Sequence, residues 1–202
     1  MAVDKIPSVE FLEDRFVFIT DTALRQNLAI NFQYIIFLIS SEEEKDLPGP
    51  VSYSIFKNII LYTASIVEGV LHYTLERMIK AGKIIEDEVM PISPEKWKWL
   101  DVKELYSIDK NTAVCGGKRI RDKEKLSRNT QFITIIRAAA KAEIIDETLK
   151  ISIDNLRELR NRIHLAGLSH VDNEYGKRDI EAQFEIASVV LDIAEKKLTE
   201  LA

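Results

Sequence analysis

Hydrophobic residues along this chain recur mostly at spacings of three and four, the period of an amphipathic helix. The clearest case follows Asp21 and Thr22, which are residue types that cap helix N-termini, and it predicts a helix over residues 22–40. The segment 34–39 is apolar nearly all round, so we expect this helix to lie centrally or at a subunit contact. Its predicted buried stripe comprises Leu24, Leu28, Phe32, Ile35 and Leu38.

An acidic and proline-rich segment ends this pattern, and a second long helix follows. Pro48 and Pro50 prevent the first helix from continuing, and the spacing predicts the next helix over residues 52–82. Glu68 stands in the middle of that helix among apolar residues. A carboxylate is costly to bury without a cation or a hydrogen-bond donor. Glu68 is therefore either partly exposed on a polar stripe or paired with Arg157 or Arg160.

The remaining pattern predicts an all-α helical bundle in one domain, residues 1–202. Its elements are two long central helices, a helix over residues 151–168 that carries an arginine–histidine motif, a long C-terminal helix and shorter helices. Residues 83–126 are irregular, and Trp97 and Trp99 are expected to cover an edge of the helical core. Gly116-Gly117 separates two strand-like runs, which predicts a small β-hairpin near residues 111–122.

Composition narrows the function classes. The 202 residues carry a net charge of −5, which argues against bulk nucleic-acid binding over the whole surface but leaves room for a local basic groove. The single cysteine, Cys115, permits no intramolecular disulfide, and we expect no metal site and no cofactor. Without a signal-like start or an uninterrupted apolar run of roughly 18 residues, we expect a cytoplasmic protein with no membrane contact.

A dense run of basic residues follows the predicted hairpin, with only Asp122 and Glu124 opposing it. Such a run is either a solvated face or a strip that contacts RNA phosphates, and the sequence alone does not decide between them. Its members are Lys118, Arg119, Arg121, Lys123, Lys125 and Arg128.

The helix over residues 151–168 combines an apolar arc with an arc of chemically useful side chains. At roughly 100° per residue, the polar set falls within an arc of about 100°. A structural interpretation remains open, in which the histidine packs near Gly167 and the arginines form ordinary ion pairs. The polar set is Arg157, Arg160, Asn161 and His164.

The sequence LRELRNRIHL, followed by a polar loop and a long final helix, resembles the HEPN superfamily, the higher eukaryotes and prokaryotes nucleotide-binding group of small helical bundles. The signature of that family is an arginine, often followed by a polar residue, then four to six residues and a histidine. Arg157 and His164 fit this spacing. The Arg160-Asn161 pair matches the arginine-plus-polar dipeptide but stands only three residues before the histidine, so the family role of each arginine stays open.

The resemblance implies one of two functions. One is a metal-independent endoribonuclease of the toxin or phage-defence type, a homodimer whose two motifs meet across a two-fold axis. His164 would then move protons, the arginines would stabilise the phosphate, Asn161 would orient either group, and Glu68 would support them. The other is a noncatalytic dimeric module that binds nucleotide or a protein partner, such as an antitoxin.

Overall fold

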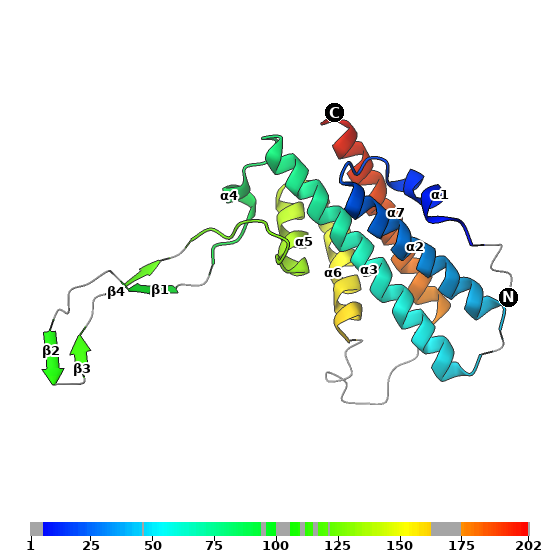
Figure 1. The fold of residues 1–202 in the computed structure, drawn as a ribbon, viewed down its shortest axis with the longest axis horizontal. Helices are drawn as coiled ribbons and strands as arrows, with labels where there is room; N and C mark the ends of the chain where they lie inside the picture. The colour runs from blue at the N-terminus through cyan, green and yellow to red at the C-terminus, as the bar shows by residue number, and fades with distance from the viewer. Residues whose placement is uncertain are drawn as a thin grey trace.

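The computed structural model shows an all-α helical bundle from which two short β-ribbons project (Figure 1). It describes residues 6–45, 47–93, 96–99, 106–109, 112–114, 117–120, 122–162 and 175–201. The predicted fold class is confirmed. The helices are α1 (Val9–Glu13), the 3-10 turn η2 (Asp14–Phe16), α2 (Thr22–Glu43), α3 (Gly49–Lys80), α4 (Glu86–Val89), α5 (Phe132–Lys141), α6 (Glu147–Arg162) and α7 (Lys177–Thr199).

Side chains that cap the helices explain where two of them begin. Asp21 accepts a hydrogen bond from the backbone N–H of Leu24 at 2.9 Å, as expected for the cap of α2. At α6 the cap is Asp146, whose Oδ1 accepts from the N–H of Leu149 at 2.7 Å. The helix therefore begins before residue 151, the predicted start, because Asp146 satisfies its first free N–H groups. The described part of α6 reaches Arg162.

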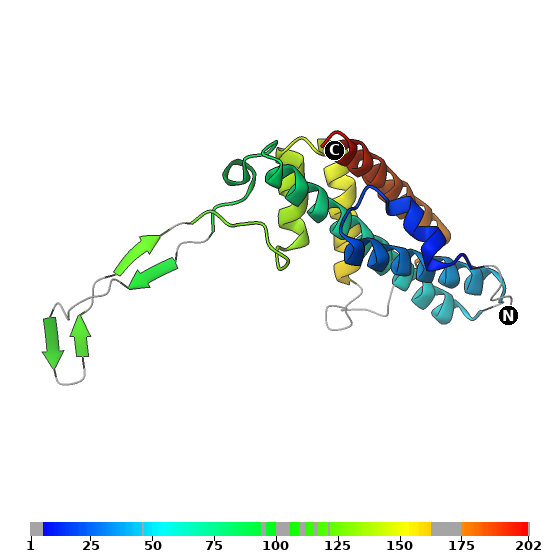
Figure 2. The ribbon, with the colours of Figure 1, turned by 45° about the horizontal axis from the view of Figure 1, so that its top comes forward.

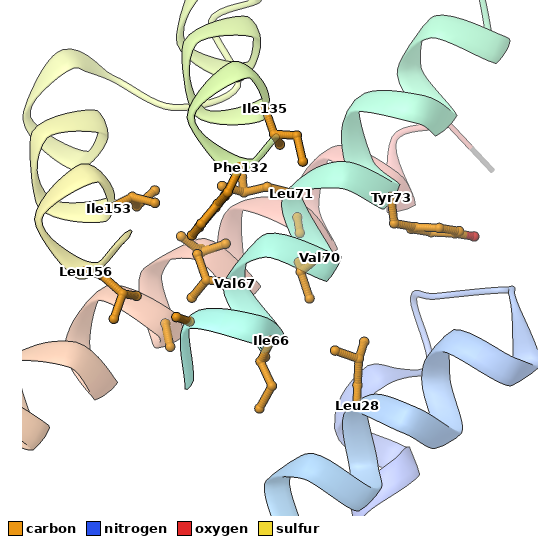
Figure 3. Packing of buried hydrophobic residues seen from close by; sticks show 14 of the residues in the cluster. Leu28, Ile66, Val67, Val70, Leu71, Tyr73, Phe132, Ile135, Ile153 and Leu156 are labelled. Carbon is orange, nitrogen blue, oxygen red and sulfur yellow. The ribbon is translucent and has the colours of Figure 1, made fainter. Parts of the chain in front are cut away.

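The core surrounds α3, which α2, α5, α6 and α7 all contact. Figure 3 shows α3 residues such as Val67 and Leu71 facing side chains from α5 and α6, while Leu28 of α2 lies nearby. Ile60, Val70 and Leu75 have no exposed surface. Burial of about 25 cal/mol per Å² of apolar surface makes this the main source of stability.

The length and apolar composition of α3 would allow it to cross a membrane, but half of the relevant window is buried inside the protein. The central helix of a helical bundle has the same two properties. The position of α3 among four other helices accounts for its apolar sequence without a bilayer (Figure 1).

The strands pair differently from the prediction. β1 (Lys96–Trp99) pairs antiparallel with β4 (Gly117–Ile120), and β2 (Tyr106–Asp109) pairs antiparallel with β3 (Thr112–Val114). The strands β3 and β4 lie within residues 111–122, yet they pair with earlier strands and not with each other. Gly117 is a strand residue opposite Trp99, so it does not form the turn of the predicted hairpin. The strands β2 and β3 are separated by only two residues in sequence.

These two ribbons together form what we call the arm. Both views show the arm standing apart from the helices (Figures 1 and 2). The expectation that Trp97 and Trp99 cover the helical core is therefore wrong, because β1 belongs to the arm. A backbone bridge between Ile92 and Lys123 marks the base of the arm, beside the helical body.

Candidate functional site

Arg160 connects the motif helix to the centre of the bundle. Its Nη1 donates a hydrogen bond to Oε2 of Glu68 on α3 at 2.6 Å, across a large distance in sequence. The Arg160 and Glu68 side chains are 32% and 26% exposed, respectively. Of the two alternatives for Glu68, the structure shows the pair with Arg160, with the carboxylate still partly exposed. This pair fixes a guanidinium group at the junction of α3 and α6 while leaving part of that group accessible.

Arg157 has a different environment, one turn earlier on α6. Its Nε donates to Asp154 at 2.6 Å, and its guanidinium also pairs with Glu158. Burial lowers the pKa of Arg157, but the hydrogen bonds to Asp154 and Glu158 outweigh this effect and leave the pKa above its ordinary value. Its side chain is only 16% exposed. Two carboxylates of its own helix thus occupy Arg157, whereas one carboxylate on another helix holds Arg160.

The other two motif residues are less constrained by the structure. Asn161 is exposed near the end of the described part of α6. His164 lies outside the described residues, so the structure does not place the imidazole relative to Arg160. What the structure brings together from the predicted site is Arg160 and Glu68.

An open groove of about 540 Å³ passes beside Glu68. Its walls come from the start of α2, the C-terminal half of α3 and the segment that leads into α5. His72 lies in it, one turn after Glu68, with Nε2 at 2.9 Å from the backbone oxygen of Ser127. Asn27 and Arg128 line it as well. The sequence did not predict this groove, because its walls are far apart along the chain.

An exposed aromatic face continues along the same sides of α2 and α3. Residues seven apart on a helix lie on nearly the same side, so Tyr34 follows Asn27, and Tyr62 precedes Gly69 of the groove. The rings of Tyr34 and Tyr62 pack edge to face with centroids 4.8 Å apart. We define the aromatic face as Ile30, Tyr34, Phe37 and Tyr62, of which the first three are 48%, 38% and 39% exposed. The expectation for residues 34–39 is thus met in part by burial, with Ile35 and Leu38 in the core.

The predicted basic run divides between the arm and the body. Lys118 and Arg119 are residues of β4, and Arg121 lies outside the described residues. Lys123 is at the base of the arm, where its Nζ donates to the backbone oxygen of Asp87. Lys125 and Arg128 are exposed, and Arg128 reaches the groove. The run therefore leads from the arm to the groove beside Glu68.

Other sites are less suited to the predicted chemistry. Among the residues that the structure describes, no three His, Cys, Asp or Glu side chains gather as metal ligands. A second cavity, of about 300 Å³, lies between η2, α2, α3 and α7 with Phe16, Phe32 and Phe184 in its walls. It does not include Glu68, which lines the groove.

Comparison of the chain with models of protein families, with curated proteins and with solved structures gave no match.

Proposed function

We propose that this protein is a metal-independent endoribonuclease of the HEPN type that acts as a homodimer in the cytoplasm. The observation that carries the proposal is the 2.6 Å contact between Arg160 and Glu68, beside an open groove. A phosphate-binding arginine needs a fixed position, accessible donors and a groove that admits a strand of RNA. Arg160 meets the first two requirements better than Arg157, which is more buried and has two carboxylate partners, and Glu68, the partner of Arg160, lines the groove.

The chemistry needs only the RNA, a histidine and an arginine. In the proposed reaction, His164 removes the proton from a ribose 2′-hydroxyl, and the 2′-oxygen attacks the adjacent phosphorus. The bond from phosphorus to the 5′-oxygen breaks, and a protonated imidazole returns a proton to that leaving oxygen. Arg160 stabilises the negative charge that accumulates on the phosphate during the attack. The products are a 2′,3′-cyclic phosphate and a free 5′-hydroxyl.

The aromatic face supports the dimeric part of the proposal. Ile30, Tyr34 and Phe37 expose apolar surface next to the groove, and aromatic residues are enriched at protein interfaces. A two-fold contact through this face would bring the grooves of two chains close to each other, as a composite site requires. We therefore assign the aromatic face to the second subunit.

The decisive experiment is RNA cleavage by the pure protein in the presence of a chelator. The His164→Ala variant is expected to lose at least about 100-fold in rate, the usual contribution of general acid–base catalysis. His170→Ala is the matched control, because it removes a histidine from the same stretch and should keep full activity. Full activity of the His164→Ala variant, or a strict requirement for a divalent metal, would contradict the mechanism.

Lysine substitutions show which arginine acts. Arg160→Lys keeps the charge but loses the planar fork of donors, so we expect a large loss of cleavage with the dimer intact. Arg157→Lys should have a much smaller effect on cleavage. If the order of the two effects is reversed, Arg157 takes the family role. The Tyr34→Ser variant should be a monomer by light scattering, and the same variant should lose RNA cleavage.

A noncatalytic module is the second candidate, and the aromatic face also favours it. The same exposed surface would suit an antitoxin or another protein partner, and Arg160 alone could hold a nucleotide phosphate. This candidate predicts no cleavage even at high protein concentration. The chain would then bind a nucleotide or a partner with no dependence on His164.

A further inference from the structure

The ribbon formed by β1 and β4 has an unusual composition for a protein with a net charge of −5. Of its eight residues, four are lysine or arginine, two are tryptophan and none is acidic. Both tryptophans of the whole chain lie in β1. β1 itself alternates lysine and tryptophan, and the strand pairing places two more basic residues, Lys118 and Arg119, opposite it although they are distant in sequence. The register pairs Lys96 with Ile120, Trp97 with Arg119, Lys98 with Lys118 and Trp99 with Gly117.

The basic residues do not stabilise the ribbon itself. Like charges directly opposite each other in an antiparallel pair are destabilising, and Lys98 stands opposite Lys118. The backbone of the ribbon also stands apart from the helices (Figure 2). A polyanion that binds clustered cations offsets the repulsion between them. Aromatic rings provide surfaces on which nucleic-acid bases stack.

We propose that the β1–β4 ribbon binds single-stranded RNA, with its lysines and Arg119 contacting phosphates and its tryptophans stacking on bases. The choice of RNA over other polyanions rests on the proposed function. Lys123 and Lys125 follow the ribbon in sequence, and Arg128 lies in the groove beside Glu68. The ribbon would therefore capture a strand outside the helical body and lead it toward the groove.

The two tryptophans allow binding to be measured without cleavage. The probe is an oligouridine of about twelve nucleotides with 2′-O-methyl groups, which lacks the nucleophilic hydroxyl. Its addition to the full-length protein should quench tryptophan fluorescence, and raised salt should weaken the binding steeply. Unchanged fluorescence at low salt, or equal binding of polyglutamate, would overturn the proposal; the second result would indicate an acidic protein as partner.

Lysine variants test the phosphate contacts. With Lys98→Gln and Lys118→Gln combined, the slope of log affinity against log salt should fall by about 1.4, since each single-strand contact contributes about 0.7. The matched control is Lys141→Gln with Lys196→Gln, which removes the same charge from exposed positions on the helices. Equal losses in both double variants would overturn the proposal, because they would show a general charge effect.

Tryptophan variants test the stacking. Trp97→Ala should weaken binding about tenfold, within the range for loss of one stacked base, and Trp97→Phe should restore most of it. A Phe variant as weak as the Ala variant would contradict stacking. The His164→Ala variant separates this proposal from the proposed function, because it should bind the probe like the wild type. Binding without any cleavage by the wild type would leave the ribbon proposal standing and remove the nuclease.

Discussion

The helical body and the arm differ in what holds them together. In the body, α3 contacts four other helices, and residues such as Ile60 and Val70 are fully buried. In the arm, each described strand pairs with a single partner strand, and a two-stranded ribbon is marginally stable alone. The comparison teaches that stability and RNA capture, as proposed, reside in different parts of the chain. Substitutions should therefore affect one without the other.

The largest expected effect comes from the core of the body. Ile60→Ala leaves a cavity around a fully buried side chain on α3 and should lower the free energy of unfolding by about 3 kcal/mol. Urea unfolding followed by circular dichroism at 222 nm measures this change. The same substitution at Ile92, at the base of the arm and 56% exposed, should cost less than about 0.5 kcal/mol. Similar losses of unfolding free energy at both positions would show that the arm and the body do not differ in their contribution to stability.

A smaller effect is expected at the junction of α3 and α6. Glu68→Gln removes the carboxylate that holds Arg160 and should cost roughly 1 kcal/mol, because the pair is half-buried and partly screened by water. Glu76→Gln is the control, since its pair with Lys80 is an exposed contact within one helix and should contribute at most about 0.5 kcal/mol. Chemical denaturation of the two variants side by side gives the difference. If Glu68→Gln is as mild as the control, the contact does not tie the two helices.

The smallest effect concerns the arm itself. Tryptophan fluorescence reports only on β1, whereas circular dichroism reports on the helices, so the two unfolding curves should not coincide. Combining Lys98→Gln with Lys118→Gln removes a like-charge pair and should move only the fluorescence curve, by less than about 0.5 kcal/mol and toward greater stability. Coincident curves in the wild type would show that the arm and the body unfold as one unit.

Sequence reasoning succeeded where the information was local. The three-and-four spacing located α2, α3 and α7, and Asp21 was identified as the cap of α2. It placed the start of α6 at residue 151, too late, because the apolar pattern becomes clear only there, whereas Asp146 caps the helix. The strand pairing was missed because register is set between distant segments, whereas a Gly-Gly dipeptide is a local signal that favours a turn.

The candidate site, too, was predicted only in part. The cost of burying a carboxylate left two alternatives for Glu68, partial exposure or a pair with Arg157 or Arg160, and the structure shows the pair with Arg160. The pattern did not choose between the two arginines, which are three residues apart and lie on adjoining parts of one helix face. The groove was not predicted, because its walls come from three separate segments. The convergence of His164 with Arg160 remains a prediction, since His164 lies outside the described residues.

The carboxylate of Glu68 has one more consequence. A guanidinium that is paired with a carboxylate has fewer free donors for a phosphate. It therefore binds a free anion more weakly than an unpaired arginine would. Small phosphates in the surrounding solution would then compete poorly for the position, and a strand held at several other points would gain access to it. In a nuclease that works in this way, Glu68 would also favour dissociation of the cleaved RNA.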